Sequence, residues 1–250
     1  MKTGKEEIMR LVFLLAACAS IALVAMICVF LFGNGLPTIG KIGVTEFFLG
    51  ETWRPNNDLY GILPMILGSA YVTLGAIVVG VPIGILTAVF MARFCPDSIY
   101  RFLKPAVELL AGIPSVVYGF FGLIVIVPLI QKLFDLPVVM VPFIRDNIGG
   151  TGSSMLTASL LLAMMILPTL ISVAEAALRA VPNSYYEGAL ALGAGHVRSV
   201  FFTIVPAAKS GIMAAIILGL GRAVGETMAV IMVAGNQARM PQGLLEGVST

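Results

Sequence analysis

The chain has 250 residues, of which 59% are hydrophobic and 11% are charged, and its formal net charge is +2. A soluble domain has about 25% charged residues, so this chain has too little polar surface to cover a globule in water. The small net charge gives no indication of a nucleic-acid partner. The composition therefore predicts an all-α protein that lies in a membrane and has lipid around it.

The three cysteines, Cys18, Cys28 and Cys95, are not at the spacing of a metal site or a redox motif. Cysteine without such spacing behaves as a small apolar residue. We therefore expect no metal site on this chain.

The first hydrophobic run is Leu11–Phe32, and it follows Lys2, Lys5 and Arg10. A signal peptide has an apolar core of about 7–15 residues followed by a small-residue cleavage site. This run is longer than such a core and has no clear cleavage site. It predicts a retained transmembrane helix.

Four further apolar runs follow, and each is longer than the ~20 residues that cross a bilayer as a helix. They cover residues 61–92, 105–130, 154–178 and 210–234. The run 61–92 is longer than a bilayer requires, so we expect it to tilt, to bend at a proline or to begin outside the hydrocarbon. The pattern predicts one membrane domain over residues 1–250, with five transmembrane spans and no soluble domain.

Two of these runs contain glycines four residues apart, Gly80 with Gly84 and Gly221 with Gly225. Small residues at this spacing let two helix backbones approach closely in lipid. The sequence leaves open whether each pair packs within the chain or against a partner chain.

The loops differ in their content of lysine and arginine, which sets orientation in the membrane. Of the 15 such residues, nine lie in the N-terminal tail and the second and fourth connections, five lie in the other loops and the C-terminal tail, and Arg222 lies within a span. The bias predicts a cytoplasmic N-terminus and places residue 250 outside.

The loop over residues 181–206 has the pattern of two short helices joined by a turn. Ser184 and Glu187 fit a capping box at the start of the first helix. Gly193 allows the chain to turn, and the second amphipathic stretch ends before Pro206. Spacing alone does not decide whether this helix–turn–helix merely connects two spans or docks on a partner.

The same loop resembles the signature of ABC importer permeases, Glu-Ala-Ala, three residues, Gly, nine residues and then Ile-x-Leu-Pro. The residues in register are Glu187, Ala189, Gly193 and Pro206, and the departures are Gly188, Thr203 and Val205. The resemblance implies that the loop docks on a separate ATP-binding subunit and transmits its closure to the spans. The four matching residues would carry that coupling.

Residues 35–42 come close to a phosphate-binding P-loop, but Ile42 stands where that motif has a serine or threonine for Mg²⁺. The segment also follows an apolar span rather than a strand. We therefore expect a transport subunit that is not an enzyme and holds no cofactor. ATP and Mg²⁺ would be bound by the partner subunit.

Arg222 and Glu226 lie inside the last apolar run. A charge at the centre of a membrane helix costs about 2.5–3.5 kcal/mol on insertion scales, and a spacing of four places both on one helix face. They could form a structural ion pair. Alternatively, they line a polar pathway in which Arg222 contacts an anion with its forked donors, while Glu226 holds Arg222 and weakens anion retention.

Residues 219–230 resemble the fifth span of phosphate importer permeases, and residues 108–123 and 53–64 are similar to the subunit of the PstC type. The resemblance implies the bundle of a type I ABC importer permease in the bacterial or archaeal cytoplasmic (inner) membrane, with phosphate as substrate. Arg222 and Glu226 match charged residues of the translocation path. The implied partners are a PstA-type second permease, a dimer of ATP-binding subunits and an extracytoplasmic phosphate-binding protein.

Two alternatives remain from the sequence. The same scaffold could import another oxyanion, sulfate or molybdate, because one arginine does not distinguish these ions by charge. A non-transport membrane scaffold or enzyme is the other, although no catalytic set of residues is present in the spans. Family members usually have six spans, so five of an expected six are found.

Other ionisable residues receive a structural interpretation. The pairs Glu175–Arg179 and Lys104–Glu108 are four residues apart at span ends, which is typical of interfacial helix pairs whose side chains reach water. His196, the only histidine, is interpreted as a solvated or docking residue.

Overall fold

The computed structural model describes residues 2–134, 154–235 and 240. The chain divides into two compact units, Met1–Ile62 and Leu63–Thr250. Arg145, Arg239 and residue 250, which entered the predicted orientation, lie outside the described residues.

The first unit begins with one long helix, α1 (Lys2–Ile42), which contains the whole first predicted span. It continues with α2 (Val44–Leu49), β1 (Trp53–Arg54), η1 (Pro55–Asn57) and β2 (Leu59–Tyr60). The two strands pair in antiparallel fashion with Trp53 opposite Tyr60. Helix α1 contains a stretch with a mean hydropathy of 2.8 that is long enough to cross a membrane, as expected of a helix surrounded by lipid.

The second unit is organised around α8 (Met155–Ala180), which packs against both α3 (Leu63–Val89) and α12 (Lys209–Gly225). Small residues on α3 allow close contact, because a Cβ atom added at Gly80 would lie 3.0 Å from Ile166 Cδ1. The pair Gly80 and Gly84 therefore packs within the chain. No atom of the described residues comes within 4 Å of a Cβ added at Gly221 or Gly225.

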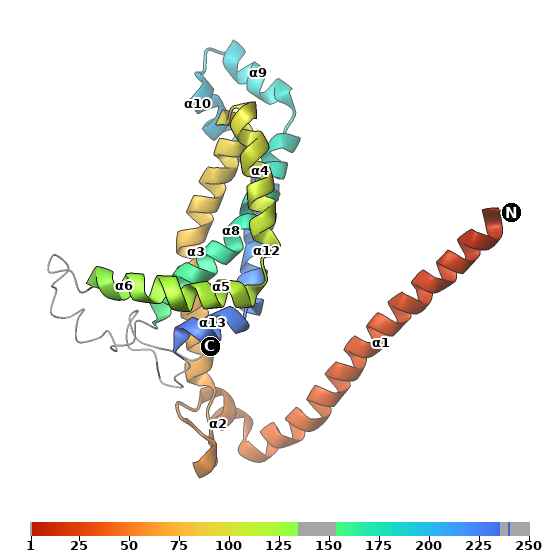
Figure 1. The fold of residues 1–250 in the computed structure, drawn as a ribbon, viewed down its shortest axis with the longest axis vertical. Helices are drawn as coiled ribbons and strands as arrows, with labels where there is room; N and C mark the ends of the chain where they lie inside the picture. Colours follow the sequence, from red (N-terminus) through yellow and green to blue (C-terminus); the bar gives the residue numbers. More distant parts are fainter. Residues whose placement is uncertain (1, 135–153, 236–239, 241–250) are drawn as a thin grey trace. The chain divides into compact units, whose positions relative to one another are not determined.

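Shorter elements complete the second unit, with α9 and α10 at the opposite end from α5 and α13 (Figure 1). They are η2 (Phe90–Phe94), α4 (Asp97–Ala111), α5 (Ser115–Phe121), η3 (Gly122–Ile126), α6 (Val127–Phe134), α9 (Asn183–Ala191), α10 (His196–Ser199), η5 (Val200–Ile204), α11 (Val205–Ala207) and α13 (Met228–Ala234).

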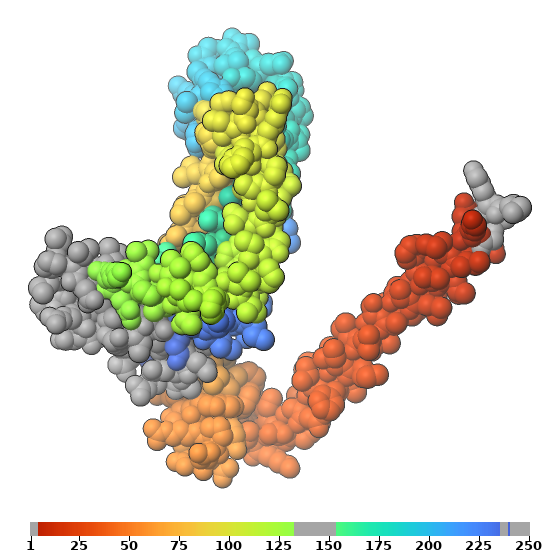
Figure 2. Space-filling model, in the orientation of Figure 1, coloured from red at the N-terminus to blue at the C-terminus, as the bar shows by residue number. Residues whose placement is uncertain are grey.

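The third predicted span, 105–130, is wrong as a single helix. Helix α4 ends at Ala111, and the apolar helical stretch that follows is Ser115–Lys132. Pro114 explains the break, since proline has no N–H and disfavours the helical conformation of the residue before it. As a result α5 and α6 run across the direction of α4 (Figure 1), and α4 covers part of α8 on the face seen in Figure 2.

The fifth predicted span, 210–234, is also interrupted. A bend of 70° between His196–Ala207 and Lys209–Gly225 lies directly before this span, and the interruption itself is at Glu226. Helix α12 then ends, because Glu226 has an extended backbone with φ −84° and ψ 115°. Helix α13 starts afresh and packs against α5.

The second and fourth predicted spans are confirmed as Leu63–Phe94 and Met155–Ala180. Within the described residues, four helices are long and apolar enough to cross a membrane, or five if the bent pair counts as one span. The structure is thus the helical membrane bundle that the sequence predicts.

Candidate functional site

Arg222 lies on the last turn of α12 and is half-buried. Its Nη1 donates a hydrogen bond of 3.0 Å to Thr169 Oγ1 on α8. Helix packing between α12 and α8 therefore fixes where the guanidinium lies, and its remaining donors have no partner among the described residues. Such a group can bind an anion with two parallel hydrogen bonds.

Glu226 lies in the break between α12 and α13, where its Oε1 accepts a 3.1 Å hydrogen bond from the Ala229 N–H. A carboxylate in this place satisfies an amide at the start of α13. The described residues show no ion pair between Arg222 and Glu226, so they do not support the structural ion pair, one of the two alternatives that the sequence left open. The four-residue rule fails because the helix ends at Gly225.

A cavity of about 170 Å³ lies next to Glu226. Residues from α3, α8 and the α12–α13 region line it, namely Ser69, Val72, Thr73, Leu162, Ala223, Val224, Glu226, Thr227 and Val230. Arg222 is not among the lining residues. The structure therefore separates the two charged residues into neighbouring but different surroundings.

The predicted coupling loop forms a helix–turn–helix at one end of the second unit. Gly193 has φ +84°, and the 3.1 Å bond from the Ala194 N–H to the Ala189 carbonyl closes the end of α9. The capping box is wrong: α9 begins at Asn183, its N-cap is Pro182, and no side chain caps it. Glu187 is instead exposed to solvent.

Aromatic contacts join the two halves of this loop. The Tyr186 hydroxyl lies 2.7 Å from His196 Nδ1, and the His196 ring packs on Phe94 with 4.7 Å between ring centroids. Large apolar side chains on the loop stay exposed, including Tyr185, Leu190, Leu192 and Val197. An ordered turn with exposed apolar residues suits docking on another protein.

Pro206, the last of the four residues in register with the signature, lies in α11 directly before the 70° bend. Helix α12 then leads from Lys209 to Arg222, a rise of about 20 Å at 1.5 Å per residue. The structure thus joins the loop to Arg222 by one rigid helix and does not bring them into one site.

We predict that Gly193→Ala lowers stability by about 1–2 kcal/mol, because a side chain disfavours a positive φ. The matched control is Gly188→Ala, which lies within α9 and has open space around its Cα. That change should leave stability equal or slightly higher, as thermal unfolding of the purified protein would show.

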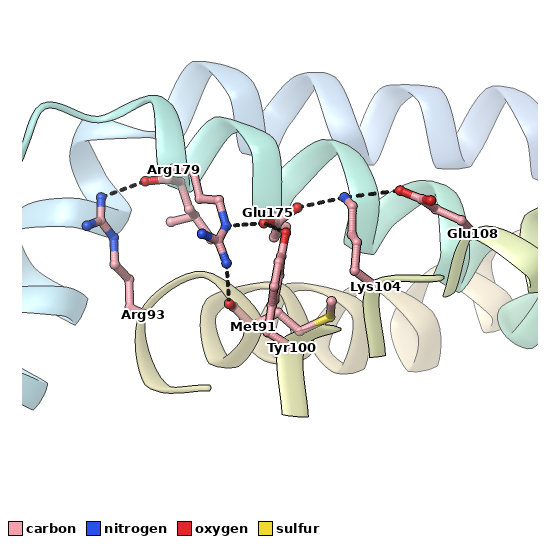
Figure 3. A network of polar contacts seen from close by, with 8 residues as sticks. Met91, Arg93, Tyr100, Lys104, Glu108, Glu175 and Arg179 are labelled. Atoms are coloured by element: carbon pink, nitrogen blue, oxygen red, sulfur yellow. Dashed lines mark hydrogen bonds and ion pairs between the residues drawn. The ribbon is translucent and has the colours of Figure 1, made fainter. Parts of the chain in front are cut away.

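A partly buried cluster comprising Tyr100, Lys104, Glu175 and Arg179 joins α4 to α8 (Figure 3). The Glu175 side chain is only 2% exposed. Its carboxylate accepts bonds of 2.9 Å from the Tyr100 hydroxyl and 2.8 Å from Lys104 Nζ, and one from Arg179 Nε. The two predicted pairs, Glu175 with Arg179 and Lys104 with Glu108, are present. The sequence did not predict the burial of Glu175 or its contacts with Tyr100 and Lys104 on another helix.

The surroundings of this cluster keep Lys104 charged. Although burial opposes the charge, the hydrogen bond and the negative charge of Glu175 hold the pKa of Lys104 above its ordinary value. Arg179 also stacks over the Tyr100 ring at 4.1 Å and donates to the Met91 carbonyl. The buried Glu175 carboxylate is therefore paired with the positive charges of Lys104 and Arg179, because an unpaired buried charge is costly.

Arg93 extends these polar contacts to the loop over residues 181–206. Its Nη2 donates to the Leu178 carbonyl at 2.8 Å, at the end of α8, and its Nη1 lies 3.3 Å from Asn183 Oδ1, at the start of α9. The C-terminal carbonyls of a helix accept such donors well. Polar contacts thus join η2, which carries Arg93, to α8 and α9, and Glu175 joins α8 to α4.

Comparison with known proteins places this geometry in context. Residues 80–249 match the family described as "Binding-protein-dependent transport system inner membrane component". The chain is 38% identical over 243 residues to the probable ABC transporter permease protein YqgH of Bacillus subtilis, covering 95% of this chain and 74% of that protein.

Two further relatives carry the name phosphate transport system permease protein PstC. The protein from Mesorhizobium japonicum is 34% identical over 242 residues, covering 94% of this chain and 73% of the relative. The protein from Haemophilus influenzae is 34% identical over 255 residues, with coverage of 97% and 79%. The similarity thus extends over almost the whole chain.

Proposed function

The chain belongs to the family of binding-protein-dependent transport system inner membrane components, and we propose on this basis that it is the permease subunit of an ATP-driven importer of inorganic phosphate. The observation that carries the proposal is the similarity to phosphate permeases over 94% and 97% of the chain. Membrane-spanning helices with a half-buried arginine at the end of α12 provide the scaffold and the anion contact that this function needs.

The proposal includes the machinery that this chain requires. A second permease of the PstA type would complete the pathway, an extracytoplasmic phosphate-binding protein would deliver the anion, and a dimer of ATP-binding subunits would hold ATP and Mg²⁺. The exposed apolar side chains of the loop between α8 and α12 support docking of that dimer. This arrangement requires the loop and the N-terminus to be cytoplasmic, as the positive charges of the loops predict.

Sulfate or molybdate import is less favoured, because the named transport substrate of the PstC relatives is phosphate. Oxyanions share the charge and hydrogen-bonding geometry that Arg222 would recognise. The relevant test must therefore compare anions directly.

The test is uptake of radiolabelled phosphate by a bacterium that lacks its own high-affinity phosphate importer and produces this chain with its three kinds of partner subunit. We expect ATP-dependent uptake that unlabelled phosphate suppresses and that a tenfold excess of sulfate or molybdate does not. Uptake of sulfate in place of phosphate, or a fully assembled complex with no phosphate uptake, would overturn the proposal.

A further inference from the structure

The cavity beside Glu226 gathers four polar side chains on an otherwise apolar part of the bundle. Ser69 and Thr73 lie one turn apart on α3, and Glu226 and Thr227 form the break between α12 and α13. The volume of about 170 Å³ exceeds that of several water molecules at ~30 Å³ each, so a five-atom oxyanion fits. Polar side chains in a membrane bundle are costly unless they face water or a ligand.

The hydrogen bonds of the described residues leave a specific set of groups unused. The Ser69 hydroxyl donates to the Met65 carbonyl at 2.9 Å, whereas Thr73 and Thr227 have no side-chain partner there. One oxygen of Glu226 accepts from the Ala229 N–H, and the other has no partner. A ligand would therefore meet two hydroxyl donors and one carboxylate acceptor.

This combination repels most anions but suits one class. An ionised carboxylate only accepts hydrogen bonds, so an oxyanion without a proton would place two acceptors and two negative charges against each other. Inorganic phosphate and arsenate carry at least one O–H near neutral pH, and that group can donate to Glu226. Sulfate and molybdate carry none under these conditions.

We propose that this cavity is an oxyanion subsite that selects protonated oxyanions, with Thr73 and Thr227 donating to the anion and Glu226 accepting its proton-bearing oxygen. This inference rests on the proposed transport function and gives Glu226 a task other than holding Arg222. Arg222, which donates a hydrogen bond to Thr169 on α8, does not line this cavity. The cavity supplies the discrimination.

A purely structural role for Glu226, capping α13, makes a different prediction. Glu226→Gln keeps a carbonyl oxygen that can accept the bond from the Ala229 N–H, but it replaces the other oxygen with an amide donor. The cap therefore survives and the preference for a protonated oxyanion does not. This substitution separates the two roles.

The experiment places a thiol at the cavity wall in the complete complex. Val224 lines the cavity and its side chain is exposed, so Val224→Cys is introduced with Cys18, Cys28 and Cys95 each changed to alanine. The rate of labelling by a charged thiol reagent is then measured in membrane vesicles with phosphate, arsenate or sulfate at equal ionic strength. We expect that the concentration of phosphate or arsenate that halves the labelling rate is at least about tenfold lower than the concentration of sulfate that does so.

Adding Glu226→Gln should bring the half-protecting concentrations of phosphate and sulfate within about twofold of each other, since the acceptor that discriminates between them is gone. The exposed Glu51→Gln is the matched control and should leave the difference unchanged. Equal protection by the two anions before this change, stronger protection by sulfate, no protection by either anion, or an unaltered preference in Glu226→Gln would overturn the inference. Phosphate uptake by the same complex, measured in parallel, shows separately whether the proposed transport function holds.

Discussion

We expect Arg222→Ala to reduce phosphate uptake by about tenfold to a hundredfold while the complex still assembles. Hydrogen bonds to a charged group contribute about 1.5–3 kcal/mol, and the variant removes both the charge and the forked donors from the pathway. The measurement is radiolabelled uptake in vesicles, with co-purification of the partner subunits as the check on assembly.

Arg222→Lys separates charge from geometry. Lysine keeps a positive charge but lacks the planar fork, so uptake should be intermediate. The matched control is Arg101→Ala, because Arg101 is exposed and has no hydrogen bond or ion pair among the described residues. Normal uptake by an assembled Arg222→Ala complex would refute the role of Arg222 in the pathway.

The sequence predicts the helical bundle well where a span is one continuous helix. Runs 61–92 and 154–178 match α3 with η2 and α8 closely, because apolar composition over a bilayer length is a direct consequence of burial in lipid. Hydropathy is averaged over a window of residues and does not report the direction in which a helix runs. It therefore could not locate the turn from α4 into α5 or the break at Glu226, although Pro114 is a local signal for the first of these.

The sequence singled out Arg222 and Glu226 as candidate site residues but did not predict the contacts that the structure gives them. Arg222 and Glu226 are four apart, and the rule that they face each other holds only while the helix continues. Thr169, Ser69 and Thr73 come from other helices, so no local spacing points to them. The partners of Glu175 could be predicted only in part. The sequence spacing indicates Arg179, whereas Tyr100 and Lys104 on α4 meet Glu175 only through tertiary packing.

We expect Glu175→Leu to destabilise the protein by about 1–3 kcal/mol, the range for losing hydrogen bonds to a charged group, because the cations left behind, Lys104 and Arg179, are 27% and 46% exposed. Leucine fills similar space but leaves Lys104 and Arg179 without the carboxylate that all three donors of the cluster share. The measurement is the thermal unfolding transition of the purified protein. Glu108→Gln is the matched control: its side chain is 60% exposed and lies 3.8 Å from Lys104, so its effect should stay within about 1 kcal/mol.

A second substitution tests whether the cost arises from the stranded charge. Adding Lys104→Met to Glu175→Leu removes a cation that the single variant leaves with only the exposed Glu108, 3.8 Å away, as ion-pair partner. Replacing both members of a buried pair is often close to neutral. The double variant should therefore regain part of the lost stability. Arg93 links the end of α8 to the first residue of α9, so movement of the loop could reach α4 through α8 and the Glu175 cluster. If the cluster transmits this movement, the double variant should still lose the coupling between ATP hydrolysis and uptake. Full recovery of both stability and coupled uptake would show that the Glu175 cluster only holds α4 in place.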